Sequence, residues 1–148
     1  MHIPDDDHLD AFFDMPCHVI DILPLQVPIA QGKNYEALAQ YLQKPEKRRS
    51  IRARFASLLL ALSAYQDIVL TEDPDGGWEE AQPAALETCI LELAENRTLY
   101  LYFAQADALL TFDGGDLYMT LYGAKGAFFT LVQLLSEAQG LFVRRGQD

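Results

Sequence analysis

Residues 98–122 read TLYLYFAQADALLTFDGGDLYMTLY, and this stretch decides the fold. Apolar side chains occupy every second position through most of it, which is the period of a β-strand that buries one face. Gly114 and Gly115 stand between two aspartates, a setting typical of a hairpin turn. The sequence therefore predicts a three-stranded antiparallel meander over about residues 98–122.

The sequence DGGD forms the predicted turn of the second hairpin. Its residues are Asp113, Gly114, Gly115 and Asp116. A two-residue connection with glycine at both central positions predicts a positive φ in at least one of them. This turn aligns Leu110 with Met119, and a similar turn at Gln105 and Ala106 aligns Leu101 with Leu110. We therefore expect Leu101, Leu110 and Met119 on one buried row.

The other face of the meander is rich in tyrosine and threonine. Its candidate binding residues are Tyr100, Tyr102, Thr111, Tyr118, Thr120 and Tyr122. Tyrosine suits a partly exposed surface, because its ring buries apolar area while its hydroxyl keeps a polar partner. Two interpretations stay open. The face is either an exposed binding or dimerisation surface, or it is covered by the N-terminal segment or a helix.

About four helices and several short strands are expected around the meander. Helices are predicted from about Asn34, from about Pro45, from about Pro83 to Glu95 and from about Lys125 to Gln139. Short strands are predicted near residues 17–23, 67–71 and 141–143. Residues 1–14 are expected to be a largely solvated acidic lead-in with one short helical turn. The expected fold class is α+β, in a single domain over residues 1–148.

The composition of the chain limits its expected partners. The 148 residues include 22 acidic and 11 basic ones, for a formal net charge of -11. This charge opposes binding to nucleic acid and to anionic membranes, and no apolar run is long enough to cross a bilayer. We therefore expect a cytoplasmic protein with no nucleic-acid or membrane partner. A basic protein or a second copy of the chain is the expected partner.

No residue pattern in the chain indicates a catalytic, cofactor or metal site. Cys17 and Cys89 are far apart and lack the spacing of a zinc site, so we expect both to be free thiols. We interpret Asp113 and Asp116 as turn residues, and their carboxylates are not expected to bind a metal ion. Six of the basic residues fall within positions 44–54, and we expect them on a solvated flank of a helix.

The sequence alone does not identify a function. The leading hypothesis is a non-catalytic interaction module, partner-binding or inhibitor-like, whose acidity suits a basic partner. One alternative is a small enzyme that uses carboxylates and tyrosines on a polar or cationic molecule. A cavity that holds at least two of Asp21, Asp107, Asp113, Asp116 and Tyr122 would favour this alternative. The other alternative is a structural or regulatory homodimer that buries the tyrosine face against its own copy.

Overall fold

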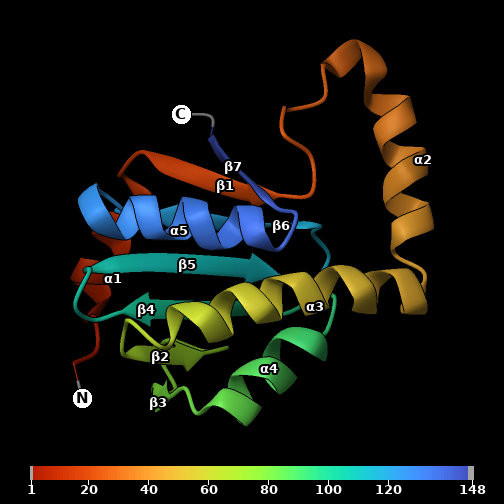
Figure 1. Cartoon of the computed structure of the whole chain (residues 1–148). Helices are drawn as coiled ribbons and strands as arrows, with labels where there is room; N and C mark the ends of the chain where they lie inside the picture. The colour runs from red at the N-terminus through yellow and green to blue at the C-terminus, as the bar shows by residue number, and fades with distance from the viewer. Residues whose placement is uncertain (1, 147–148) are drawn as a thin grey trace.

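The computed structural model describes residues 2–146, and its centre is one antiparallel β-sheet (Figure 1). Within these residues the strand order is β3-β2-β4-β5-β6-β1-β7, and five α-helices accompany the sheet. The strands are β1 (Cys17–Asp21), β2 (Ile68–Thr71), β3 (Glu79–Glu80), β4 (Thr98–Phe103), β5 (Ala108–Asp113), β6 (Tyr118–Tyr122) and β7 (Phe142–Arg145). The predicted α+β class is confirmed. The meander of β4, β5 and β6 is the middle of this larger sheet.

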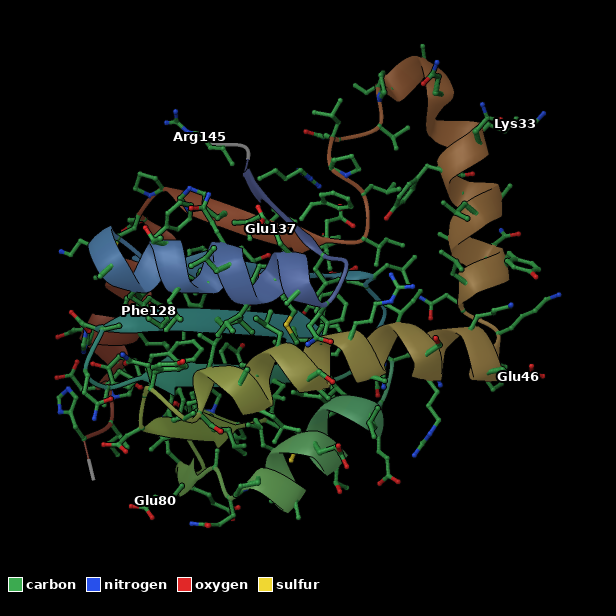
Figure 2. The ribbon with its side chains drawn as sticks, viewed as in Figure 1. Lys33, Glu46, Glu80, Phe128, Glu137 and Arg145 are labelled. Carbon is green, nitrogen blue, oxygen red and sulfur yellow. The ribbon has the colours of Figure 1, made fainter. Side chains whose placement is uncertain are left out.

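Three helices cover one face of the sheet and build the main core (Figure 1). They are α3 (Pro45–Leu62), α4 (Pro83–Leu91) and α5 (Gly126–Ala138). Aromatic pairs join helix to sheet: the ring centroids of Phe55 and Phe112 are 5.7 Å apart. Phe128 of α5, labelled in Figure 2, packs on Phe103 at 5.1 Å. This is the apolar face that the alternation in the sequence predicts.

The strand pairing of the meander agrees with the prediction in one hairpin and differs in the other. In the first hairpin Leu101 faces Leu110, as predicted. In the second hairpin Leu110 faces Leu121 instead of Met119. A shift of two residues leaves every side chain on its predicted face, because side chains alternate with a period of two. The buried row is therefore Leu101, Leu110 and Leu121.

The register differs because β5 and β6 do not pair directly at the DGGD turn. The amide of Asp116 donates to the carbonyl of Asp113 at 3.0 Å, so a β-turn does form there. The strands are nevertheless connected by residues 114–117, and neither Gly114 nor Gly115 has a positive φ, so the predictions of a two-residue connection and of a positive φ are wrong. Gly114 lies instead against the loop that follows α4. A Cβ atom at this position would meet the carbonyl oxygen of Ala94 at 1.9 Å, and the Gly114 amide donates to the carbonyl of Arg97 at 2.9 Å. The glycine permits a close approach of two loops.

Arg52 of α3 is buried and contacts both the loop that follows α4 and the β5–β6 connection. The prediction that the basic residues of positions 44–54 lie on a solvated flank is therefore wrong for Arg52. Its side chain is 3% exposed and lies over the ring of Phe112, 5.5 Å from the centroid. It donates to three backbone carbonyls, those of Leu91 (3.2 Å), Leu93 (2.6 Å) and Gly114 (2.8 Å). A guanidinium can be buried here because the carbonyls satisfy its donors. Arg52 thus ties the end of α4 to the β5–β6 connection.

The opposite face of the sheet, which we call the open face, is covered in part by α1 (Asp6–Phe13). Leu9 and Phe12 of this helix are buried with Tyr102 of β4 and Leu109 of β5. The segment expected as a solvated lead-in therefore belongs to the fold, although its aspartates are exposed as expected. The four predicted helices correspond to α2, α3, α4 and α5, and α1, with 8 residues, is longer than the single turn expected in the lead-in.

Between β1 and α3 the chain leaves the sheet in a projection that we call the arm (residues 22–44). It contains a short 3-10 helix (Ile29–Gln31) and α2 (Gly32–Leu42), which stands away from the sheet (Figure 1). No residue of α2 is buried. The arm also exposes large apolar side chains, with Leu25 76% and Ile29 99% accessible. Its exposed apolar surface adjoins the open face of the sheet.

Candidate functional site

A cavity of about 860 Å³ lies between the open face and the arm. We call it the tyrosine cavity. Strands β1, β6 and β7 supply its floor, which comprises Cys17, Val19, Asp21, Tyr118, Thr120, Tyr122 and Arg144. The arm supplies its wall, which includes Leu23, Leu25, Val27, Ile29 and Tyr35. The volume falls within the roughly 300–1,000 Å³ that is usual for ligand sites.

Strand pairing explains why these floor side chains converge. Val19 of β1 faces Thr120 of β6, and Asp21 faces Tyr118. On its other side β1 pairs with β7, which places Arg144 opposite Val19. Directly paired residues of an antiparallel sheet point to the same face. Three strands that are distant in sequence therefore present their side chains to one cavity.

A buried ion pair lies in the floor of the cavity. Nη2 of Arg144 donates to Oδ2 of Asp21 over 3.0 Å, and the two side chains are 20% and 6% exposed. The other oxygen, Oδ1, accepts from the backbone amides of Ile22 (2.7 Å) and Leu23 (3.3 Å). Nε of Arg144 is buried and has no partner within residues 2–146. Both oxygens of Asp21 accept hydrogen bonds from within the chain, so its carboxylate is poorly placed to transfer protons to or from a ligand. The ion pair instead fixes the shape of the cavity floor.

Three phenol groups face the cavity, those of Tyr35, Tyr118 and Tyr122. Burial raises the pKa of Tyr118 to about 12, helped by the negative charge of Asp116 and a hydrogen bond to it. Burial is also the largest cause of the raised pKa of Tyr35 and of Tyr122. All three tyrosines therefore stay protonated at neutral pH. They offer aromatic surface together with hydroxyl groups that donate and accept hydrogen bonds.

Asp113 and Asp116 lie beside Tyr118, one of the residues that line the cavity. Burial is the largest cause of the raised pKa of Asp116, and the charge of Asp113 adds to it. Asp113 accepts a hydrogen bond from the hydroxyl of Thr98. Neither carboxylate forms an ion pair with any residue in the part of the chain that the structure describes. The predicted turn residues are thus an unneutralised acidic pair next to the cavity.

The predicted tyrosine face is divided between two environments. Tyr102 is 1% exposed beneath α1, and its hydroxyl donates to Asp107 at 2.9 Å. Tyr100 and Thr111 are half-buried, and Tyr100 packs against the cluster under α1. The remaining members, which line the cavity, are Tyr118, Thr120 and Tyr122. The covered interpretation therefore holds for Tyr102, while the other end of the face forms the cavity floor.

Several residues of the cavity were not assigned to a site from the sequence. Tyr35 falls in the helix predicted from about Asn34, and no pattern in the sequence singles out Arg144. Asp21 was named only as a possible acid. The alternation of Cys17, Val19 and Asp21 along β1 places them on one face, but the pairing of β1 with β6 has no local signal.

Of the other candidate groups, Asp107 and Cys89 lie outside this cavity, whereas Cys17 is part of its floor. Asp107 accepts from Nε2 of His8 at 2.8 Å, which joins the first hairpin to α1. Cys17 and Cys89 are free thiols. No group of three His, Cys, Asp or Glu side chains in residues 2–146 is arranged to hold a metal ion. Over the same range, no helix has both the length and the apolar character needed to cross a bilayer.

No family model, curated protein or solved structure matches this chain. The chemistry of the tyrosine cavity is therefore the basis for a functional proposal. Protonated phenols, a neutralised ion pair and apolar arm side chains together provide a surface suited to binding.

Proposed function

We propose that the protein is a binding module that takes up a segment of a partner protein in the tyrosine cavity. One observation carries this proposal. Helix α1 covers the open face over β4 and β5, whereas the tyrosine cavity leaves this face open over β6, β1 and β7. The arm beside the cavity exposes Leu25 and Ile29. Exposed apolar residues around a hollow are typical of interaction sites, and tyrosine is enriched in such surfaces.

The charge of the chain favours a basic partner over a second copy. A net charge of -11 attracts a basic protein and speeds its encounter with the cavity. The same charge on two identical chains opposes their association. Binding to a basic partner is therefore expected to weaken as the salt concentration rises.

An enzyme is the second candidate, because Asp21 and Tyr122 line the same cavity. This convergence meets the condition that the sequence suggested for a small-molecule enzyme. The state of the two groups favours binding instead. Asp21 is held by Arg144 and two backbone amides, and the raised pKa of Tyr122 keeps its phenol protonated at neutral pH. Neither group is prepared to act as a base.

A pair of exposed leucines gives a matched test of the proposal. Leu25 lines the cavity, whereas Leu134 is 60% exposed on α5 and does not line it. Leu25 is largely exposed and outside any helix, so Leu25→Asp should change the free energy of unfolding by less than about 0.5 kcal/mol. Leu134→Asp places a negative charge in the C-terminal half of α5 and should cost about 1 kcal/mol, which leaves the protein folded. Any difference in binding between the two variants then reports on the cavity.

The measurement is affinity capture from the source cell with wild type and both variants, followed by direct binding of the purified partner. We expect wild type and Leu134→Asp to retain a basic protein that salt releases, and Leu25→Asp to lose it. Equal retention by all three proteins would contradict the proposal. Sedimentation of the same three proteins tests the homodimer: self-association that only Leu25→Asp abolishes would make a second copy the partner.

A further inference from the structure

Two tyrosines from different elements line the tyrosine cavity, and we call the part of the cavity next to them the Tyr35–Tyr118 end. Tyr35 comes from α2 in the wall and Tyr118 from β6 in the floor, and both line the cavity. They are close enough for the charge of one to affect the other. Asp21 faces Tyr118 across the β1–β6 pair. Aromatic rings with carboxylates close by form a favourable environment for a cation.

Negative charge is in excess around these two rings. Asp21 is neutralised by Arg144, but Asp113 and Asp116 have no basic partner among residues 2–146. The wall adds Lys33 and Glu36, one charge of each sign. Two neighbouring carboxylates repel each other when both are ionised, and Asp116 is partly buried. A cation supplied from outside the chain would relieve this repulsion.

We infer that the Tyr35–Tyr118 end of the cavity binds a positively charged side chain, lysine or arginine, of the partner protein. The ring faces of Tyr35 and Tyr118 contact the cationic group, and Asp116 with Asp113 supplies the opposing charge. The apolar stem of the same side chain lies along Val19 and the arm. This inference rests on the proposed function and names the chemistry of the partner residue that the cavity recognises.

An anionic group fits this end of the cavity less well. The guanidinium of Arg144 already donates to Asp21, so the pair has little net charge to offer. An anion would also lie near Asp113 and Asp116. Electrostatics at this end therefore favour a cation.

Three six-carbon probes of different charge test the inference: n-hexylammonium, n-hexanol and n-hexanoate. Each is titrated into isotope-labelled protein while the ring signals of the tyrosines are followed by NMR. We expect hexylammonium to shift the signals of Tyr35 and Tyr118 at a concentration roughly tenfold below that of hexanol. We expect hexanoate to bind most weakly.

Charge-matched variants assign the effect to the acidic pair. Asp116→Asn should remove most of the preference for hexylammonium over hexanol. Asp75→Asn removes the same charge from an exposed loop next to β3, at the far edge of the sheet, and should keep the preference. Tyr118→Leu keeps apolar volume without an aromatic face, and we expect it to weaken hexylammonium several-fold. The NMR spectrum of each variant reports whether it is folded.

Three results would overturn the inference. Equal binding of hexylammonium and hexanol, or tighter binding of hexanoate, would mean that the cavity does not recognise a cation. Absence of any shift at Tyr35 and Tyr118 would also overturn it. If Leu25→Asp still abolished partner binding in that case, the proposed function would stand and the cation site would fail alone.

Discussion

Replacing Tyr102 by alanine tests whether α1 and the sheet form one cooperative unit. The ring is almost fully buried, lies 6.1 Å from the ring of Phe12 and 5.7 Å from that of His8, and packs with Leu109. Truncation of a buried large aromatic residue costs about 3–5 kcal/mol. Because small proteins unfold with about 5–15 kcal/mol, Tyr102→Ala should remove a large share of the free energy of unfolding.

Two further substitutions separate the contributions. Tyr102→Phe keeps the ring and removes the hydrogen bond to Asp107, which should cost about 1 kcal/mol. Tyr118 is half-buried in the cavity floor, so Tyr118→Ala should cost about 1 kcal/mol as well while it weakens partner binding. Urea unfolding followed by circular dichroism measures all three free energies.

The ordering of these variants is the decisive result. If Tyr102→Ala lost less than about 1 kcal/mol, α1 would not be packed as described. If Tyr118→Ala lost as much as Tyr102→Ala, Tyr118 would be a core residue. In that case the cavity floor would not be a binding surface.

Three other perturbations have defined outcomes. Arg52→Met removes the donor from three carbonyls, two of them in buried hydrogen bonds, and should lower the free energy of unfolding by about 3–5 kcal/mol, measured by urea unfolding. A loss under about 1 kcal/mol would show that water replaces the guanidinium. Gly114→Ala puts a Cβ 1.9 Å from the carbonyl oxygen of Ala94 and should cost about 2 kcal/mol or more in thermal unfolding, and an unchanged melting temperature would disprove the close approach. Burial and Asp113 raise the pKa of Asp116 above 3.8 in the folded protein, so its contribution to stability falls as the pH rises through that raised value. Asp116→Asn should therefore be more stable than wild type at neutral pH, with the difference disappearing below pH 3.8; a variant less stable than wild type at neutral pH would contradict this sign.

The features predicted correctly from the sequence are those with a local signal. Alternation of apolar and polar residues separates the two faces of β4, β5 and β6, and the first hairpin has the predicted pairing of Leu101 with Leu110. Pro45 and Pro83 each lie in the first turn of a helix, as their lack of an amide proton favours.

The features that the sequence did not predict depend on contacts between distant residues. Gly114 is required because Ala94 lies close by, which a turn rule based on positive φ does not consider. Arg52 is buried because three carbonyls from two loops surround it, whereas its neighbours in sequence suggest a solvated flank. The cavity could not be predicted because its floor combines β1 and β7 with the meander.

The ion pair between Asp21 and Arg144 has a consequence for biosynthesis. The two residues are 123 positions apart in the sequence, and their ion pair connects β1 with β7, the first and the last strand along the described chain. Contacts of this length form late, because the entropy lost in closing so long a loop precedes any gain from the contact. A nascent or truncated chain that stops before Arg144 can pair β4 with β5, yet it leaves Asp21 without its counter-ion and the cavity without part of its floor. If the proposed partner binds in the tyrosine cavity, chains without β7 should be unable to engage it and should not compete for it with chains that include β7.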